Sequence, residues 1–258
     1  MDVIDPFFGA RAALLDHLPK ELILERYRAA GGEELSSGKF LSPESSAALA
    51  ANAFGVFAER PDLLTLPSPA VAPGEALSVQ LETQMLFPWR GGLHPWLDVA
   101  IETKGSLIAV EAKRYEPFRD RKTCVFSEAY SRPVWGPAMR PFETMRDDLK
   151  AGSRFVFLDA AQLVKHAFGL RTEAERRKKR AVLCYLYAEP KSFPDGKPIS
   201  PFETGAHRQE LAAFAAAVSS TPSQVTFCSL PYSELLRHWL QKPTLRHHAT
   251  ALTARFDV

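Results

Sequence analysis

The clearest pattern in the chain is the segment Trp96-Leu-Asp-Val-Ala-Ile-Glu-Thr-Lys-Gly-Ser-Leu-Ile-Ala-Val-Glu-Ala-Lys113. Two runs with apolar positions at alternate residues flank Lys104-Gly105, which predicts two antiparallel strands joined by a two-residue loop. Gly105 can supply the positive φ that such a loop often requires. In this register Thr103 faces Ser106, and the rest of the hairpin pairs accordingly.

The same register brings acidic side chains together. Asp98 lies opposite Glu111, and Lys113 lies opposite Trp96 on the same face of the hairpin. Residues directly across an antiparallel pair have Cβ atoms about 4.5–5.5 Å apart, and like charges at that spacing are destabilising. A strand pair that places two carboxylates together is therefore expected to use them, with a cation or a shared proton between them.

The register also divides the hairpin into two faces. Because side chains alternate along a strand, a slip of one residue would mix these two sets. The first face is apolar and suited to a core: Val99, Ile101, Ile108 and Val110. The second face carries the charges, with small residues that leave room beside them: Asp98, Ala100, Glu102, Leu107, Ala109, Glu111 and Lys113.

Two carboxylates at the end of a hairpin are hard oxygen ligands, which suit Mg²⁺ or Mn²⁺ better than zinc. Magnesium keeps several waters, so Asp98, Glu111 and the carbonyl of Ala112 suffice when a substrate phosphate joins the shell. Lys113 can orient a metal-bound water or stabilise charge on the phosphoryl group. Glu82, on the preceding strand, is a candidate third carboxylate with a catalytic or outer-shell role. These residues outline a phosphodiester hydrolase.

Asp98, the twelve-residue gap and Glu111-Ala-Lys113 resemble the PD-(D/E)XK nuclease superfamily, which includes many restriction endonucleases. The resemblance implies that Asp98 and Glu111 are metal ligands, that Lys113 is the catalytic lysine and that Glu82 is a less regular extra acid. A second Glu-x-Lys string, Glu189-Pro190-Lys191, has no acid on a preceding hairpin strand, and Pro190 cannot donate to a sheet ladder.

The resemblance extends to one helix. The segment with Gln162 resembles the Gln-x-x-x-Tyr helix of RecB-like nucleases, except that His166 stands where the family has Tyr. The resemblance therefore implies a nucleic-acid contact for Gln162, while the alternative for both side chains is an ordinary packing or surface position on the helix.

The order of elements fits this family. Ser42-Pro43-Glu44 is typical of a helix start, and Asp159 caps a helix that ends at Gly169. Strands over residues 77–87, 96–103, 107–113 and 181–187 complete an αβββαβ core, and residues 207–240 add a further αβα. We expect an α/β fold of the restriction-endonuclease-like class, with a central mixed sheet flanked by helices. Residues 1–43 form an N-terminal accessory arm or helices, and residues 44–258 form the nuclease-like domain.

Residues 114–140 are the best candidate surface for nucleic acid, because cations can neutralise phosphates and aromatic rings can stack on bases. The alternative is a loop folded over the sheet with its aromatic residues buried. The expected contacts are Arg114, Arg119, Arg121 and Lys122, together with Gln162 from the helix that Asp159 caps. The basic run at residues 171–180 is interpreted either as a solvated helix face or as a further DNA contact.

Composition limits the setting. The chain has 258 residues, 46% of them hydrophobic, enough for one sizeable core. Its formal net charge of +2 excludes a global polycation, so binding to nucleic acid requires a local patch. The longest apolar run, residues 211–218, is far shorter than the roughly 20 residues that span a bilayer. The three cysteines argue against a disulfide framework, so we expect a cytoplasmic protein of undefined oligomeric state.

The sequence therefore predicts a metal-dependent nuclease that hydrolyses phosphodiester bonds, with DNA as the expected substrate. Two alternatives remain open at this point. The same fold could serve as an inactive module that binds nucleic acid or protein, or the site could belong to a phosphoesterase acting on a small nucleotide. Dependence on a divalent ion separates the enzyme from the scaffold, and a long basic groove would favour a polymer over a small substrate.

Overall fold

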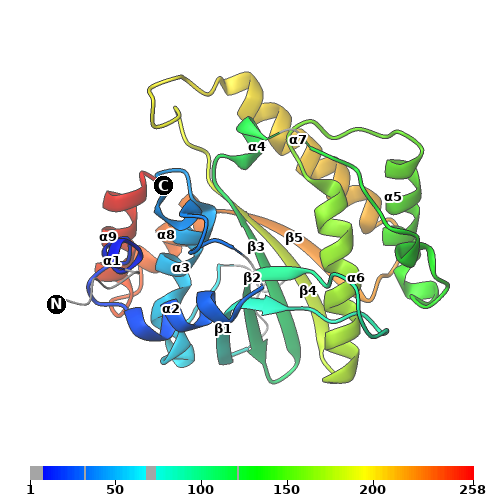
Figure 1. Ribbon diagram of the computed structural model, residues 1–258, viewed down its shortest axis with the longest axis horizontal. Helices are drawn as coiled ribbons and strands as arrows, with labels where there is room; N and C mark the ends of the chain where they lie inside the picture. Colours follow the sequence, from blue (N-terminus) through cyan, green and yellow to red (C-terminus); the bar gives the residue numbers. More distant parts are fainter. Residues whose placement is uncertain (1–7, 32, 68–73, 121) are drawn as a thin grey trace.

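The hairpin at residues 96–113 lies within a five-stranded sheet (Figure 1). The computed structural model describes residues 8–31, 33–67, 74–120 and 122–258. The strands follow one another in space as in sequence, and they are β1 (Ala76–Gln84), β2 (Trp96–Thr103), β3 (Ser106–Lys113), β4 (Arg180–Tyr187) and β5 (Val225–Pro231). The first three strands are antiparallel, and β3, β4 and β5 are parallel. This confirms the expected mixed sheet.

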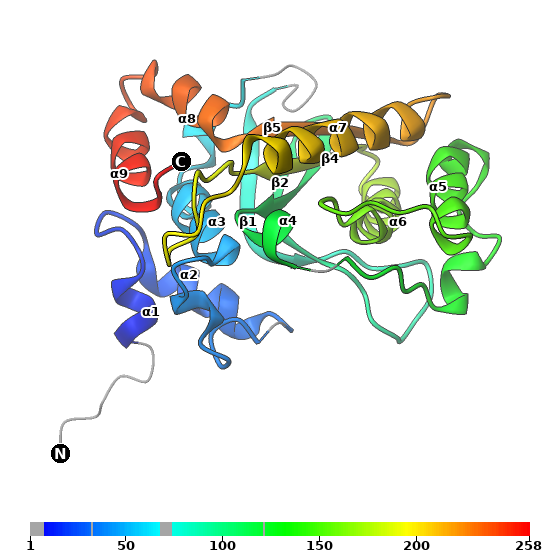
Figure 2. The same ribbon diagram turned by 90° about the horizontal axis from the view of Figure 1, so that it is seen from above.

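Helices cover both faces of the sheet. The α-helices are α1 (Phe8–Ala12), α2 (Lys20–Ala29), α3 (Ser46–Phe54), α4 (Glu116–Arg119), α5 (Arg140–Lys150), α6 (Ala160–Arg176), α7 (Pro201–Val218), α8 (Tyr232–Leu240) and α9 (Arg246–Phe256). Short 3-10 turns are η1 (Lys39–Leu41), η2 (Gly55–Ala58), η3 (Pro61–Leu63), η4 (Glu128–Ser131) and η5 (Pro137–Met139). Figure 2 shows α1, α2, α3, α8 and α9 on one side of the sheet and α5 and α6 on the other. The fold is an α/β sandwich.

The hairpin register is confirmed where β2 and β3 form a ladder, from the pair Val99–Val110 to the pair Glu102–Leu107. The loop has the predicted two residues, but Gly105 does not adopt the left-handed φ expected of it. The Thr103 hydroxyl oxygen instead accepts hydrogen bonds from the backbone N–H groups of Gly105 and Ser106, at 3.3 and 2.9 Å. A side-chain turn of this kind replaces the backbone turn that glycine would have provided.

The apolar face of the hairpin is confirmed as core. Its four residues are at most 2% exposed and belong to the cluster that also contains α3, α8 and α9. The residues on the opposite face were expected to leave room beside the charged groups, but they pack against a helix instead. Ala100, Leu107 and Ala109 are also buried, and they pack in a second cluster with α6 and with Trp135. They leave room for a covering helix rather than for charged groups.

Several helix boundaries differ from the predicted ones, and α7 begins at Pro201 rather than at residue 207. Helix α3 begins at Ser46 because the Ser45 side chain accepts the bond from the Ala48 N–H, so Ser42 is not the cap. Asp159 caps α6 as predicted, with its Oδ1 2.8 Å from the Gln162 N–H. The helix then continues through Gly169 to Arg176 instead of ending there.

The N-terminal segment shares a core with the rest of the chain. Leu14, Ile23, Leu24 and Tyr27 are at most 3% exposed and lie in the same cluster as Trp239 of α8. The boundary at residue 43 stays a prediction, but the described part of this segment covers the sheet as closely as the later helices do. Within the described ranges, no helix is both long enough and apolar enough to cross a membrane.

Gly169 explains why α6 can lie so close to the sheet. A Cβ built at this position would lie 2.8 Å from Cγ of Pro95 and 2.9 Å from the carbonyl oxygen of Met85. Backbone atoms cannot move aside cheaply, so even a methyl group forces the helix outward. The glycine therefore sets the distance between α6 and the end of β1.

We predict that Gly169→Ala lowers the free energy of unfolding by about 1–3 kcal/mol, the usual cost of overpacking. Gly205 in α7 provides a matched control, since a Cβ there meets nothing within 4 Å. Gly205→Ala is expected to stabilise the protein by roughly 0.5–1 kcal/mol, because alanine favours the helix. Urea denaturation of both variants measures the difference, and equal effects would contradict the packing argument.

Candidate active site

Three neighbouring strands carry an acidic residue at the same level of the sheet. Glu82 lies in β1, Asp98 in β2 and Glu111 in β3. The ladder pairs on either side place Glu82 opposite Asp98. Glu82, Asp98 and Glu111 thus form a row across the three strands, called the acidic row below. In the parallel half of the sheet, the register partner of Glu111 is Tyr185 of β4. The fold thus brings together the three acids that the sequence singled out.

Asp98 is attached to β3 through its side chain. The backbone ladder between β2 and β3 stops at Val99–Val110, so neither Asp98 and Glu111 nor Trp96 and Lys113 are the ladder partners that the sequence predicted. In place of a ladder bond, Oδ2 of Asp98 accepts a 2.6 Å hydrogen bond from the N–H of Ala112. The two strands diverge where the acids begin, which opens this end of the hairpin.

Glu111 is 3% exposed and lies between two nitrogen groups. Its Oε1 is 2.6 Å from Nζ of Lys113, and its Oε2 is 3.1 Å from Nδ1 of His166 on α6. Burial alone would raise the pKa of Glu111, but the charges of Lys113 and His166 lower it to about 2. The carboxylate is therefore ionised and held in one orientation.

The pKa values of the other two acids, Asp98 and Glu82, are raised instead of lowered. Burial, with Glu111 and Glu82 nearby, raises the pKa of Asp98 well above its ordinary value. Burial and the charges of Glu34 and Glu111 raise the pKa of Glu82 to about 7. A carboxyl pKa rises when the ionised form is desolvated and faces other negative charges. Without a bound cation, the row cannot hold three full charges at low cost.

Glu82 also has an unusual backbone. Its φ is 46°, in the left-handed region that residues other than glycine rarely adopt, and it lies inside a β-strand. Such a conformation costs of order 1 kcal/mol or more, and strained residues cluster at functional sites. The strain coincides with the level of the sheet at which the acids meet.

The structure adds residues that the sequence did not indicate. Glu34 lies near enough to Glu82 to affect its pKa. Glu116 of α4 does the same for Lys113, and its carboxylate accepts hydrogen bonds from Ser46 Oγ and from the Arg114 N–H. Glu34 and Ser46 are remote from the hairpin in sequence, and no local pattern marks them.

The donor set fits a hard divalent cation with an incomplete protein shell. Within the described part of the chain, no group of three or more His, Cys, Asp or Glu side chains is arranged to hold a metal ion by itself. Magnesium commonly binds through one or two carboxylates plus waters and phosphate oxygens. Asp98 and Glu111 match that pattern, and a cation beside Asp98 would relieve the repulsion that raises its pKa.

The residues expected to contact nucleic acid differ in exposure and in the partners they already have. Arg114 is 6% exposed, and its guanidinium donates to the carbonyl oxygens of Pro43 and Phe256, so it has a structural role. Arg119 is exposed and pairs with Asp120 and Glu44. Lys122 donates to the carbonyl oxygen of Glu116, and Gln162 is half-buried in the first turn of α6. Arg121 lies outside the described residues.

The aromatic and basic side chains of residues 114–140 and 171–180 mostly serve packing. Tyr115, Tyr130 and Trp135 are at most 9% exposed, which supports the buried-loop interpretation for them. Basic side chains of residues 171–180 form ion pairs with acids of the same chain. These contacts are Arg171 to Glu175, Arg176 to Glu173, Arg177 to Glu102 and Lys179 to Glu102.

The second Glu-x-Lys string lies beyond the end of a strand and not within one. Glu189 follows the end of β4 and forms a two-point ion pair with Arg208 of α7, with both N···O distances at 2.5 Å. Lys191 is exposed. The string at residues 111–113 differs because it lies within a strand and has a second acid on the neighbouring strand.

A comparison with protein families gives a match over almost the whole chain. A family model described as "Restriction Endonuclease associating with ARP" matches residues 12–256. The chain belongs to this family. No curated protein and no solved structure matched the chain. Membership indicates a nuclease, and the mixed five-stranded sheet with helices on both faces agrees with a restriction-endonuclease-like fold.

The electrostatics of the row give a stability prediction for the metal-free protein. We expect Asp98→Asn to stabilise it at neutral pH by about 1–2 kcal/mol, because the amide oxygen can still accept from Ala112 while the repulsion disappears. Glu111→Gln is expected to destabilise it by roughly 1–3 kcal/mol, since Lys113 loses its buried partner. Thermal unfolding in EDTA measures both. The charge argument is wrong if the two variants shift Tm in the same direction.

Proposed function

We propose that this protein is a Mg²⁺-dependent nuclease of the PD-(D/E)XK type that cleaves DNA. The observation that carries the proposal is the row of Glu82, Asp98 and Glu111 on adjacent strands, with Lys113 2.6 Å from Glu111. Family membership independently favours an endonuclease. In support, Asp98, Glu111 and Lys113 lie together at one end of the hairpin, as the resemblance to this superfamily implies.

Each residue has a role that follows from its surroundings. Asp98 and Glu111 would hold the ion, which supplies charge neutralisation and activation of a water molecule for attack on phosphorus. Asp98 is oriented by Ala112, and Glu111 is oriented by His166 and Lys113. These contacts fix the carboxylates before substrate arrives, so little reorganisation is needed during the reaction.

Lys113 is suited to stabilising negative charge. Burial would lower its pKa, but the carboxylates of Glu111, Glu116 and Asp98 raise it above the ordinary value. The ammonium group therefore stays charged and can donate to a phosphoryl oxygen or orient the attacking water. Glu82 supplies a further carboxylate beside Asp98, and we assign it to positioning water at the edge of the row.

The nucleic-acid contacts in this proposal are Arg119, Lys122 and Gln162. Arg119 is the last residue of α4, the helix that follows β3, and Lys122 comes shortly after it. Gln162 lies one helical turn before His166, which contacts Glu111. The cations would contact phosphates and supply affinity that decreases with salt. Arg114 is left out because its guanidinium is occupied by main-chain carbonyls.

Cleavage of plasmid and single-stranded DNA with Mg²⁺ or Mn²⁺ tests the proposal. We expect Lys113→Ala to reduce the rate by at least about a hundredfold, the usual loss when one transition-state donor is removed. Lys191→Ala is the matched control, since it removes the lysine of the second Glu-x-Lys string and should leave the rate unchanged. Absence of cleavage would favour an inactive binding module, and cleavage that survives Lys113→Ala would rule out the assigned site.

Metal binding has a separate readout in thermal unfolding. A ligand that binds only the folded state stabilises it by about 2.7 kcal/mol at a hundred times its Kd. We therefore expect Mg²⁺ to raise the Tm of the wild-type protein, and Asp98→Asn to abolish most of that increase. The Glu189→Gln variant, outside the row, should respond as wild type does. An equal response of all three proteins would show that the ion binds elsewhere.

A further inference from the structure

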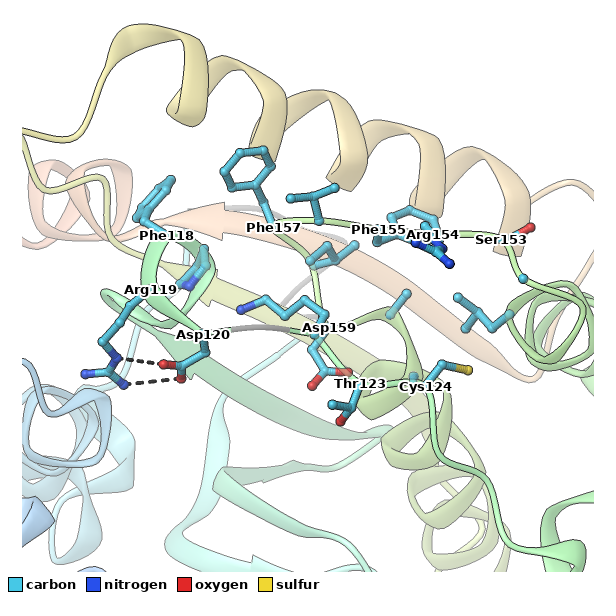
Figure 3. Close-up of a pocket in the computed structure, with 18 residues that line it drawn as sticks. Phe118, Arg119, Asp120, Thr123, Cys124, Ser153, Arg154, Phe155, Phe157 and Asp159 are labelled. Atoms are coloured by element: carbon cyan, nitrogen blue, oxygen red, sulfur yellow. Dashed lines mark hydrogen bonds and ion pairs between the residues drawn. The ribbon is translucent and has the colours of Figure 1, made fainter.

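A cavity of about 540 Å³ lies at the N-terminal end of α6 (Figure 3). One wall comes from α4 and the residues that follow it, and the other comes from residues 152–161, which lead into α6. None of the three row acids lines it. Its volume falls in the range of roughly 300–1,000 Å³ that is typical of pockets for small organic ligands.

The walls combine flat aromatic groups with polar ones. Phe118 and Phe157 have ring centroids 6.3 Å apart and meet at 53°, so they form a bent apolar surface rather than a closed stack. Thr123, Asp159 and Arg154 line the cavity as well (Figure 3). Arg154 is exposed, and none of the described acids forms an ion pair with it.

One wall is held rigidly before any ligand arrives. The carboxylate of Glu210 in α7 accepts hydrogen bonds from three consecutive backbone N–H groups, those of Val156, Phe157 and Leu158, at 2.8, 2.9 and 2.8 Å. This anchors the loop that carries Phe157 to a long helix. A preformed wall reduces the entropy lost on binding.

The cavity is close to the acids along α6. Asp159 lines the cavity and caps the helix, and His166, seven residues later, contacts Glu111. Seven residues span roughly 10 Å of an α-helix. A nucleotide chain with one phosphate at the row can therefore reach the cavity with the base of a nearby nucleotide.

We propose that this cavity receives an unpaired nucleobase of the DNA strand whose phosphate lies at Asp98 and Glu111. The inference rests on the proposed function and specifies its substrate as DNA with a base that is single-stranded or turned out of the duplex. Phe118 and Phe157 supply the stacking surface, Arg154 contacts the backbone outside, and Asp159 and Thr123 offer hydrogen-bonding groups to the base edge.

Binding of strands with one missing base tests the proposal. A single-stranded DNA of about 12 nucleotides is compared with versions carrying one abasic nucleotide at each position, with Ca²⁺ in place of Mg²⁺ so that a divalent ion is present while cleavage is slow. Loss of one stacked base costs about 1–3 kcal/mol, so one or two positions should weaken wild-type binding by roughly tenfold. Thr123→Trp, which fills the cavity from an exposed position, should bind the intact strand as weakly as the abasic one.

The matched control is Thr221→Trp, an exposed threonine that does not line the cavity, and it should behave as wild type. A chemical readout needs no variant. Cys124 is an exposed free thiol on the cavity wall, while Cys184 is buried. The intact strand should slow alkylation of Cys124 by a maleimide several-fold, and the strand lacking the critical base should not.

Several results would overturn the proposal. They are an abasic scan with no sensitive position, equal binding by the two tryptophan variants, and absence of binding to any strand. Failure of the proposed function gives a different pattern, because cleavage is then missing while the abasic scan and Cys124 protection remain positive. Base-dependent binding without cleavage would identify a nucleic-acid-binding module, and cleavage without base dependence would leave the nuclease but refute the cavity's role.

Discussion

The repulsion among neighbouring carboxylates is the constraint that organises this structure. Glu111 contacts Lys113 and His166 directly, whereas Asp98 accepts one backbone N–H and is affected by the charge of Lys113. Such an arrangement persists only if the surrounding fold is stable enough to impose it. The two clusters of buried residues, one on each face of the sheet, provide that stability at a site that is unfavourable in isolation.

Much of the sheet could be predicted because its signals are local. The period of two in residues 96–113 fixes the hairpin register, and the register fixes the faces. The positions of His166 and Glu34 could not be predicted, since they depend on how α6 and the N-terminal segment pack. The end of α6 was missed for a related reason. Gly169 looks like a stop signal in sequence, but its lack of a side chain serves contact with Met85 inside a continuous helix.

Charged residues in this chain mostly satisfy other parts of the chain. In residues 171–180, the side chains of Arg171, Arg176, Arg177 and Lys179 pair with Glu102, Glu173 or Glu175. Arg114 donates to two carbonyl groups in the interior. These cations are therefore already paired within a chain whose formal net charge is only +2. Contacts with a polyanion must come from few residues, so we expect geometry near the acids to matter more than bulk charge.

The short loop at Lys104-Gly105 has a consequence for the order of folding. Contacts between residues close in sequence cost little loop entropy and form fast, whereas β3 and β4 can pair only after the long segment between them has been arranged. The β2–β3 hairpin can therefore bring Asp98 and Glu111 near each other before α6 covers them. During that interval the acids are still solvated, and their charges become costly only when the last layer closes.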